Sequence, residues 1–406
     1  MNKNNDQFVV FYRQSDNQYN TLKSNRKTQQ RPKVYPILSK KFNCFEVMKG
    51  YSASDEGLKE YMKDLQKWMT ELSTNTIHPI DYHYYVNHRQ AAYCFFLKFS
   101  KRHIKDFEHV YHDESKWMES CYNAGNRYLR SPGLYKCYGY DYISYYPECQ
   151  TMIKIPKRAG RSIRLSKLHK NLEYGMYRVQ IKSEDERVKM LFQFSKNNTY
   201  THFSIQYARF LKDQGFDLSI KLIQDEEDNA YIYDQGDLVS GRKLFFKWYK
   251  TLLQLKAKFP KNRLIKSLGS TLWGRLIQFN RKTVSEVEMK DIDDKNDYDI
   301  DDIRMGKNLD MTFVLKPKSG QMYKTELARI KPFVTSFGVQ RIGRELIKND
   351  VDLNHVVRIQ TDGVILMDKY NFSDPSFVVD PKTTGKIKFK HFDSYFNISM
   401  NKQVGR

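Results

Sequence analysis

Two helical patterns in the middle of the chain, separated by a proline, limit most strongly what this sequence can fold into. Apolar residues recur at helical spacing over residues 243–258 and again over 262–279. Phe259-Pro260-Lys261 lies between them, and proline ends a helix because it lacks a backbone N–H and clashes with the preceding turn. The sequence therefore predicts a helical hairpin, and its many lysines make that hairpin cationic.

Segments with the character of β-strands lie on both sides of this hairpin in the sequence. They cover residues 134–140, 216–223, 230–233, 356–360 and 364–367. The last two are joined by Thr361-Asp362-Gly363, which is typical of a tight hairpin turn. Further helices are expected over 57–72, 91–99 and 326–348. We expect residues 1–35 to form a flexible polar arm around one short apolar run, Phe8 to Tyr12, and the acidic segment 285–310 to form a solvated loop.

The composition allows a globular protein with a sizeable core. The chain has 406 residues, of which 40% are hydrophobic, so it is long enough for one multi-lobed unit or for two to three domains. Its formal net charge of +22 favours a polyanionic partner, nucleic acid first and an acidic membrane surface second. A coding background rich in lysine, asparagine and tyrosine would also produce this charge.

Cysteine usage and hydropathy indicate an intracellular protein. The five cysteines form no C-x-x-C pair, which disfavours a disulfide framework or a thiolate zinc site and favours a reducing compartment. The N-terminus is polar, and no stretch of about 18 apolar residues occurs. We therefore expect no signal peptide and no membrane span.

Three short constellations carry residue types that phosphoryl transfer requires. Asp141 ends a predicted strand, Asp362 lies in the predicted turn, and Lys266 shares a helix face with Ser270. Taken singly, each has an ordinary explanation as a turn residue, a cap or a solvated helix face. Together with Lys256 they supply two carboxylates for a pair of Mg²⁺ ions about 4 Å apart and cations for a triphosphate.

At these positions the sequence resembles the family-B DNA polymerases. The stretch Asp141 to Pro147, with Ser144 and Tyr146, is similar to motif A, Asp-x-x-Ser-Leu-Tyr-Pro. The stretch Lys266 to Gly274 is similar to motif B, Lys-x-x-x-Asn-Ser-x-Tyr-Gly. Ser270, Thr271 and Trp273 stand there where Asn, Ser and Tyr are usual.

The third motif and the regions around it follow in the expected order. Residues 360–363 resemble motif C, Asp-Thr-Asp-Ser, and keep only the second aspartate, Asp362. The segments 332–347 and 385–389 are similar to the palm helix before motif C and to the Gly-x-Leu-Lys stretch after it. The resemblance covers roughly residues 121–395 and is nearest to the viral, plasmid and organellar branch, which includes protein-primed enzymes.

The resemblance implies a role for each matched residue. Asp141 and Asp362 would hold both metal ions with the carbonyl of Tyr142, Tyr146 would exclude a ribose 2′-hydroxyl, and Lys266 would contact the triphosphate and protonate the leaving pyrophosphate. The other nucleotide contacts would be Lys256, Arg263, Ser270 and Trp273, and the DNA contacts would be Gly274, Thr361, Lys386 and Lys388. For Tyr146 and Trp273, packing in the hydrophobic core stays open as an alternative. For Lys386 and Lys388, a position on a solvated face stays open.

The resemblance also implies the cofactors, the partners and the place in the cell. Two Mg²⁺ ions, for which Mn²⁺ can substitute, would serve as cofactors. Primer-template DNA and dNTPs would be the partners, with a priming or processivity protein as a further candidate and no membrane. A viral enzyme would work in the host cytoplasm or nucleus, and an organellar enzyme in the mitochondrion.

The implied fold is α+β. It is a polymerase right hand with an antiparallel-sheet palm, helical-hairpin fingers and a reduced thumb, together with a mainly helical N-terminal module. The boundaries would be 1–120 for that module, 121–240 and 283–395 for the two parts of the palm, 241–282 for the fingers and 396–406 for a residual thumb or tail.

Two departures from the family pattern are visible in the sequence. The only Asp-x-Glu match before motif A is Asp106-Phe107-Glu108, which lies too near Asp141 to leave room for the other exonuclease motifs, so we expect no proofreading activity. Few residues follow the Lys386 to Lys390 stretch, so the thumb is short and low processivity is expected.

The leading interpretation is a DNA-directed DNA polymerase without an exonuclease. The alternative is a non-catalytic, polymerase-like DNA-binding subunit of a replication complex, which the lost first acid of motif C and the altered motif B favour. A third interpretation is a primase-polymerase or a polymerase of RNA.

Overall fold

The computed structural model describes residues 6–13, 18–25, 42–46, 55–82, 87–121, 125, 127–131, 133–290, 297–305, 311–389 and 400–401. The chain forms two compact units, each built from two separate stretches of sequence. Unit 1 comprises Met1–His112 and Arg242–Ala328, and unit 2 comprises Asp113–Gly241 and Arg329–Arg406.

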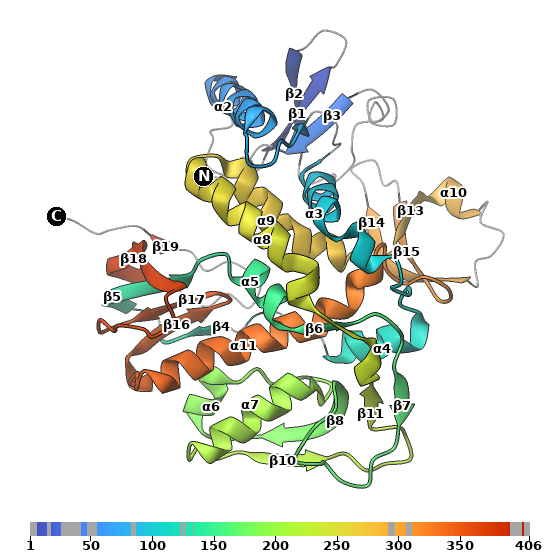
Figure 1. Cartoon of the computed structure of the whole chain (residues 1–406), viewed down its shortest axis with the longest axis vertical. Coiled ribbons are helices and arrows are strands. Elements are labelled where there is room, and N and C mark those ends of the chain that lie inside the picture. The colour runs from blue at the N-terminus through green and yellow to red at the C-terminus, as the bar shows by residue number, and fades with distance from the viewer. Residues whose placement is uncertain are drawn as a thin grey trace. The chain divides into compact units, whose positions relative to one another are not determined.

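Unit 1 contains the predicted helical hairpin. Its long helices are α2 (Asp55–Thr74), α3 (His88–Ile104), α8 (Gly241–Lys258) and α9 (Arg263–Leu276), and α8 and α9 lie side by side in Figure 1. Asn262 caps α9 by accepting a hydrogen bond from the Leu264 amide, and its side-chain amide donates to the Trp68 carbonyl of α2. Helices were predicted for all four segments, and these predictions are confirmed.

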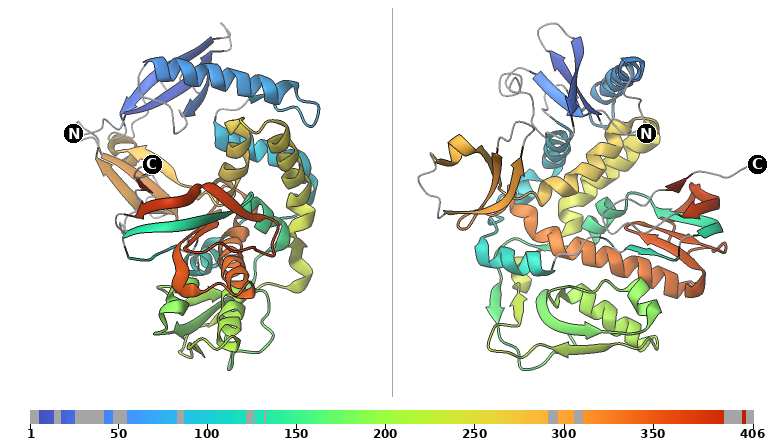
Figure 2. Two further views of the ribbon diagram at one scale, coloured as in Figure 1. Left: turned by 90° about the vertical axis from the view of Figure 1, so that its left-hand side faces the viewer. Right: turned by 180° about the vertical axis from the view of Figure 1, so that it is seen from behind.

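Two small antiparallel sheets complete unit 1, and both correct the sequence analysis. Strands β1 (Asp6–Arg13), β2 (Gln18–Asn25) and β3 (Phe42–Glu46) pair in the order β2-β1-β3. Strands β13 (Lys282–Ser285), β14 (Tyr298–Met305) and β15 (Met311–Pro317) pair in the order β13-β15-β14, with the short helix α10 (Glu286–Lys290) after β13. In Figure 2 the second sheet is orange.

The predictions of a flexible arm over 1–35 and a loop over 285–310 are therefore wrong for the described parts of those segments. For β2 and β14 the reason is that polar composition indicates exposure to water but does not reveal backbone pairing. Strand β1 contains an apolar run, and it pairs with β2 and with the more distant β3. Strand β14 is almost wholly exposed, yet it pairs with β15 from Tyr298 to Met305. Residues 291–296 and 306–310 lie outside the described residues, as do parts of the 1–35 segment.

Unit 2 contains a six-stranded sheet with the order β19-β18-β5-β17-β16-β4. Its strands are β4 (Arg127–Leu129), β5 (Gly133–Tyr142), β16 (Val356–Gln360), β17 (Gly363–Leu366), β18 (Phe377–Phe389) and β19 (Met400–Asn401). Every pair in it is antiparallel. The strands predicted over 134–140, 356–360 and 364–367 are confirmed.

Helix α11 (Ile330–Lys348) runs along one face of this sheet (Figure 1), as predicted for the segment 326–348, whose first turn is the 3-10 helix η4 (Glu326–Arg329). The guanidinium of Arg341 on α11 lies over the ring of Tyr142, 4.4 Å from its centroid, so Tyr142 points toward the helix. Because side chains alternate along a strand, Asp141 and Cys137 point to the opposite face. Cys137 packs there with Val357, Ile365 and Ile387.

A second sheet packs on the far side of α11. It has the order β10-β8-β11-β7, with β9 paired to β8. Its strands are β7 (Arg161–Ile163), β8 (Gly175–Lys182), β9 (Thr199–Thr201), β10 (Ser219–Leu222) and β11 (Ala230–Ile232). Helices α6 (Glu186–Leu191) and α7 (His202–Asp213) accompany it, and Phe203 of α7 contacts Phe337 of α11 with ring centroids 5.4 Å apart. Two of these strands were predicted, over 216–223 and 230–233, and the first is shorter than predicted.

The remaining elements of unit 2 connect these layers. They are α4 (His112–Cys121), α5 (Tyr145–Met152), β6 (Lys154–Pro156) paired with β12 (Leu238–Ser240), and the 3-10 turns η2 (Gln235–Asp237) and η5 (Leu353–His355). A buried ion pair joins both stretches of the unit: Arg329, fully buried before α11, donates to both carboxylate oxygens of Glu114 on α4 at 2.7 and 2.8 Å. Tyr233 donates to the same carboxylate at 2.9 Å.

The predicted α+β class is confirmed as a mixed fold of helices and antiparallel sheets. The finer layout of palm, fingers and thumb, and the predicted domain boundaries, stay predictions. No helix in the described part of the chain is long and apolar enough to span a membrane.

Candidate active site

Asp141 lies near the end of β5, the strand with a partner strand on each side. Gly363 of β17 is its partner on one side and Val378 of β18 is its partner on the other. The Asp141 side chain is exposed, although the Tyr140 and Tyr142 side chains on either side of it are buried. The alternation of the strand therefore presents one carboxylate on the face of the sheet opposite α11.

Asp362 lies in the turn between β16 and β17, where it was predicted. The turn spans Gln360 to Gly363, and the Asp362 amide donates to the Gln360 carbonyl at 2.7 Å. The Tyr142 amide donates to the Asp362 carbonyl at 3.0 Å. The backbone of Asp362 in this turn thus lies beside the end of β5, which carries Asp141.

Gly363 is required here for space. A Cβ atom at this position would lie 2.9 Å from the Tyr140 carbonyl oxygen and 3.1 Å from Asp141 Oδ1. The ordinary explanation of Asp-Gly in a turn is a positive φ at glycine, but the turn residue with positive φ is Thr361, at 58°. The glycine therefore lets the Asp141 carboxylate lie close against the β17 backbone.

Two strained backbone positions flank the aspartates. Four non-glycine residues in the described part of the chain have positive φ: Ser144, Asn198, Asp350 and Thr361. Asn and Asp tolerate this region, whereas serine and especially β-branched threonine rarely adopt it. Ser144 is the N-cap of α5 and lies three residues after Asp141, and Thr361 precedes Asp362, so the unusual residue types coincide with the two motifs.

Tyr146, the predicted sugar-selecting residue, is half-buried beside the same turn. Gly125 marks the contact: a Cβ atom there would lie 2.8 Å from the Tyr146 hydroxyl and 2.9 Å from Thr361 Cγ2. The neighbouring ring of Tyr145 is buried, and its hydroxyl donates to the Gly338 carbonyl of α11. The Tyr146 hydroxyl and the Thr361 side chain therefore both lie next to Gly125.

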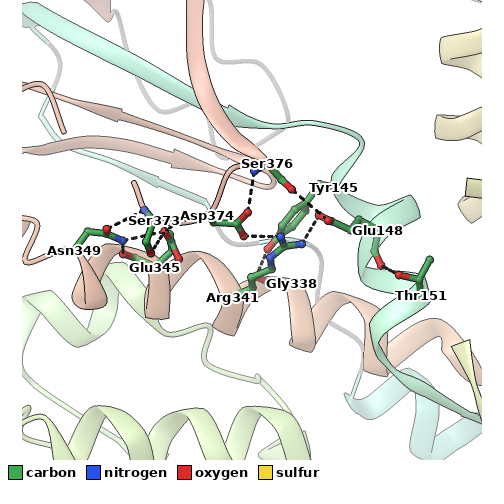
Figure 3. Close-up of polar contacts among 10 residues, drawn as sticks. All are labelled: Tyr145, Glu148, Thr151, Gly338, Arg341, Glu345, Asn349, Ser373, Asp374 and Ser376. Carbon is green, nitrogen blue, oxygen red and sulfur yellow. Dashed lines mark hydrogen bonds and ion pairs between the residues drawn. The ribbon is translucent and has the colours of Figure 1, made fainter. Parts of the chain in front are cut away.

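A polar network on α11 fixes the segment that carries Asp141 (Figure 3). Arg341 donates to Glu148 of α5 at 2.7 Å and to Asp374, before β18, at 2.6 Å. Ser376 closes the network, because its amide donates to Asp374 and its hydroxyl donates to Glu148. The Arg341 side chain is 12% exposed, so both ion pairs are largely shielded from water.

The charges of this network stabilise one another. Burial opposes the charge of Arg341, but its hydrogen bonds with Asp374 and Glu148 outweigh burial and raise its pKa above the ordinary value. Burial likewise works against the charged form of Asp374, yet the bond from Arg341 lowers its pKa. Arg341 is thus a fixed cation that positions the strand and helix on either side of Asp141.

The predicted DNA contacts of unit 2 lie on β18. Lys386 is exposed and stands opposite Lys136 of β5, so two lysines are neighbours across the strands. Lys388 stands opposite Leu134 in the backbone pairing, and its side chain lies outside the described residues. Thr361 lies in the turn described above.

The remaining predicted residues belong to unit 1. Lys256 is on α8, and the others are on α9: Arg263, Lys266, Ser270, Trp273 and Gly274. Burial lowers the pKa of Lys256, and the charge of Lys266 lowers it further, so these two predicted triphosphate contacts lie near each other. The Ser270 hydroxyl donates to the Lys266 carbonyl, Trp273 is half-buried, and the space beside exposed Gly274 is open.

The donor set of unit 2 suits magnesium. Asp141, Asp362 and the Tyr142 carbonyl all offer oxygen atoms, the ligands that Mg²⁺ prefers. Within the described ranges no three or more His, Cys, Asp or Glu side chains gather into a metal site. Two carboxylates are nevertheless the usual protein share of an Mg²⁺ site whose other ligands are water and substrate phosphates.

Three residues that shape the site were not assigned a role from sequence. Gly125 lies in a stretch without a recognisable motif, and Glu148 and Asp374 look like ordinary surface acids. Arg341 was noticed only as part of a helix similar to the palm helix. Its partners are distant in sequence, so no local pattern could have identified the network.

Comparisons with known proteins show a likeness in structure. No protein-family model and no curated protein matches the sequence. The structure of phi29 DNA polymerase complexed with primer-template DNA and incoming nucleotide substrates has a TM-score of 0.51 and 12% identity, over 79% of this chain and 55% of that chain.

Two other solved structures of phi29 DNA polymerase show the same degree of structural similarity to this chain. The complex of phi29 DNA polymerase with single-stranded DNA has a TM-score of 0.52 and 11% identity, over 79% of this chain and 54% of that chain. Its post-translocation binary complex with primer-template DNA has a TM-score of 0.52 and 12% identity, over 84% and 59%. The chain spans little more than half the length of phi29 DNA polymerase in these structures, and the likeness shows a polymerase-like fold.

Proposed function

We propose that this chain is a template-directed DNA polymerase of the family-B type, which adds dNTPs to a primer 3′ end without proofreading. The observation that supports it most is the pairing of β5 with β17, which brings Asp141 next to the turn that carries Asp362. The fold around them is similar to that of phi29 DNA polymerase, and the three motifs occur in the family order.

In this proposal the residues of unit 2 hold the metal ions and the primer end. The Asp141 and Asp362 carboxylates and the Tyr142 carbonyl bind two Mg²⁺ ions, which activate the 3′-hydroxyl and balance the charge of the pyrophosphate when bound. The two lysines near each other in unit 1, Lys256 and Lys266, bind the triphosphate, and anion binding relieves their mutual repulsion.

Primer extension with Mg²⁺ on a defined template tests the proposal. Asp141→Asn and Asp362→Asn should each slow extension about a thousandfold, a loss of about 4 kcal/mol in transition-state stabilisation. Asp213→Asn, an exposed aspartate on α7, is the matched control and should extend at the wild-type rate. Extension by either site variant at the wild-type rate would show that the site is assigned wrongly.

The sugar-selecting role of Tyr146 has a separate test. Tyr146→Ala should raise incorporation of NTPs relative to dNTPs by at least tenfold. Gly125→Ala should also change this ratio, because the new methyl group would meet the Tyr146 hydroxyl. A wild-type enzyme that uses NTPs and dNTPs equally well contradicts the role and favours a polymerase of RNA.

The alternative is a non-catalytic, polymerase-like subunit that binds DNA. The single acid of motif C and the altered motif B favour it. Wild-type protein that binds primer-template tightly and incorporates no dNTP would decide for this alternative.

A further inference from the structure

A cationic hollow in unit 1 has no role in the proposed catalysis. It has a volume of about 620 Å³ and is lined by five cations and one aromatic ring, with no acidic residue: Lys98, Phe99, Lys101, Arg102, Lys105 and Lys247. We call it the basic hollow. Its residues come from the C-terminal end of α3, including the residue that caps it, and from α8.

The cations of the basic hollow form an ordered stripe. Lys98, Lys101, Arg102 and Lys105 follow the spacing i, i+3, i+4 and i+7, which places them on one face of α3. That stripe rises about 10 Å along the helix axis, a length that suits consecutive phosphates of an extended strand. Lys247 of α8 adds a charge from a second helix.

The two helices are held firmly together beside the hollow. The Ser100 hydroxyl of α3 donates to the Leu244 carbonyl of α8 at 2.6 Å, and this hydrogen bond is buried. Phe96 stacks on Phe245 with ring centroids 4.9 Å apart. The cations therefore stand on a preformed platform, which lowers the entropic cost of binding a ligand.

Two of these cations have neutral hydrogen-bond partners: Lys98 donates to the Pro79 carbonyl at 3.4 Å, and Arg102 donates to His103 Nε2 at 3.2 Å. None of the five cations forms an ion pair in the described part of the chain, and all five are exposed. The pKa of the neighbouring His103 is affected by the same positive charges. Burial lowers this pKa first, and the charges of Arg102, Lys243 and Lys247 lower it further.

Helix stability accounts for only part of this arrangement. Cations in the last turn of α3 are favoured by the helix dipole, whereas Arg242 and Lys243 in the first turn of α8 oppose it. Repulsion between the two helices adds a further cost. Such an electrostatic cost in stability is expected where the positive charge serves to bind an anionic ligand.

We propose that the basic hollow binds a single nucleic-acid strand, with its cations on consecutive phosphates and the Phe99 ring against a base. A positive groove with an aromatic ring is the chemistry that recognises single strands without regard to sequence. The inference rests on the proposed function only in that a polymerase must hold unpaired template, and the binding itself needs no catalysis.

The test measures binding of a fluorescent oligo-dT strand to the full chain in EDTA, over a series of NaCl concentrations. Lys101→Gln/Arg102→Gln should weaken binding about tenfold at low salt and reduce the slope of log K against log salt by about 1.4, the value for two lost phosphate contacts. The control Lys212→Gln/Lys221→Gln removes the same charge from exposed positions in unit 2 and should leave the slope unchanged. If the two double variants change the affinity and the slope equally, the proposal is overturned.

Phe99→Leu tests the base contact while keeping an apolar side chain. Binding of oligo-dT should weaken about fivefold or more, and binding of an abasic strand of equal length should not change. Equal loss for both strands, or tighter binding of duplex DNA at the hollow, would contradict the assignment to a single strand.

The two proposals fail separately. If the protein does not extend primers but still binds a single strand at the basic hollow, only the polymerase proposal is contradicted. If primer extension is normal and Lys101→Gln/Arg102→Gln leaves the slope of log K against log salt unchanged, only the proposed role of the basic hollow is contradicted.

Discussion

At the scale of single residues, Arg341 holds two carboxylates from separate parts of unit 2. Arg341→Met leaves Glu148 and Asp374 as close, shielded carboxylates without a cation, which should cost about 3 kcal/mol in the free energy of unfolding. Arg341→Lys should recover only part of this, because an ammonium cannot bridge two carboxylates as a planar guanidinium does. Urea denaturation measures the difference.

The matched control is Arg344→Met on the same helix. Arg344 stacks on Phe210 at 4.1 Å and forms no ion pair among the described residues, so its loss should cost about 1 kcal/mol or less. If Arg341 positions Asp141, its Met variant should also need more Mg²⁺ for half-maximal extension, and Arg344→Met should not. Equal Mg²⁺ requirements would leave Arg341 with a structural role alone.

Thr361 stores strain that glycine would release. A threonine at a φ of 58° costs about 1–3 kcal/mol, so Thr361→Gly should raise the free energy of unfolding by about 1 kcal/mol despite the greater entropy of the unfolded chain. Thr361→Val keeps the branched Cβ and should bring no gain. Thermal unfolding of the three proteins decides, and a destabilised glycine variant would show that the threonine contacts outweigh the strain.

The sequence indicated the residues whose local context is distinctive, and it missed those that act over long distances. Asp141 and Asp362 could be placed on a strand end and in a turn because strands, turns and helices have short-range patterns. The strain at Thr361 and the close approach at Gly363 depend on how β16, β17 and β5 meet. Such contacts have no signature in a single stretch of sequence.

At the scale of elements, the Glu114–Arg329 pair joins α4 to the start of α11. Glu114→Gln should cost about 3–5 kcal/mol, because it leaves a buried guanidinium without its counter-charge. The double variant Glu114→Gln/Arg329→Met removes that charge and should recover most of the loss. Chemical denaturation checks this, and a double variant as unstable as the single one would show that the pair contributes more than mutual compensation.

Long amphipathic helices were the elements that the sequence predicted best, since their apolar spacing is regular. Polar strands were the elements it missed. Strands β2 and β14 lie in segments whose polar composition is typical of loops. Their pairing depends on partners elsewhere in the chain, which composition does not reveal.

At the scale of the whole molecule, His202 makes folding sensitive to acid. It is 5% exposed among Tyr174, Phe203 and Phe333, and burial lowers its pKa to about 3. The unfolded chain takes up its proton near pH 6.5, so the free energy of unfolding should fall by about 1.4 kcal/mol per pH unit as the pH drops from 6.5 toward 3. The contribution is fully present above pH 6.5.

The variant His202→Phe should remove this part of the pH dependence. The exposed His169→Phe is the control and should keep the wild-type profile. Unfolding measured between pH 7 and pH 4 provides the comparison, and parallel curves for wild type and His202→Phe would contradict the assignment.

The pairing of β5 with β17 and β18 also has a consequence for biosynthesis. More than two hundred residues separate Asp141 from Asp362, and both named partners of β5 belong to the last part of the chain. During translation β5 leaves the ribosome long before either partner exists, so its edges must wait unpaired, and closing so long a loop slows folding. The two aspartates can meet only when β17 has been made, and a ribosome that stalls earlier releases a chain without the site.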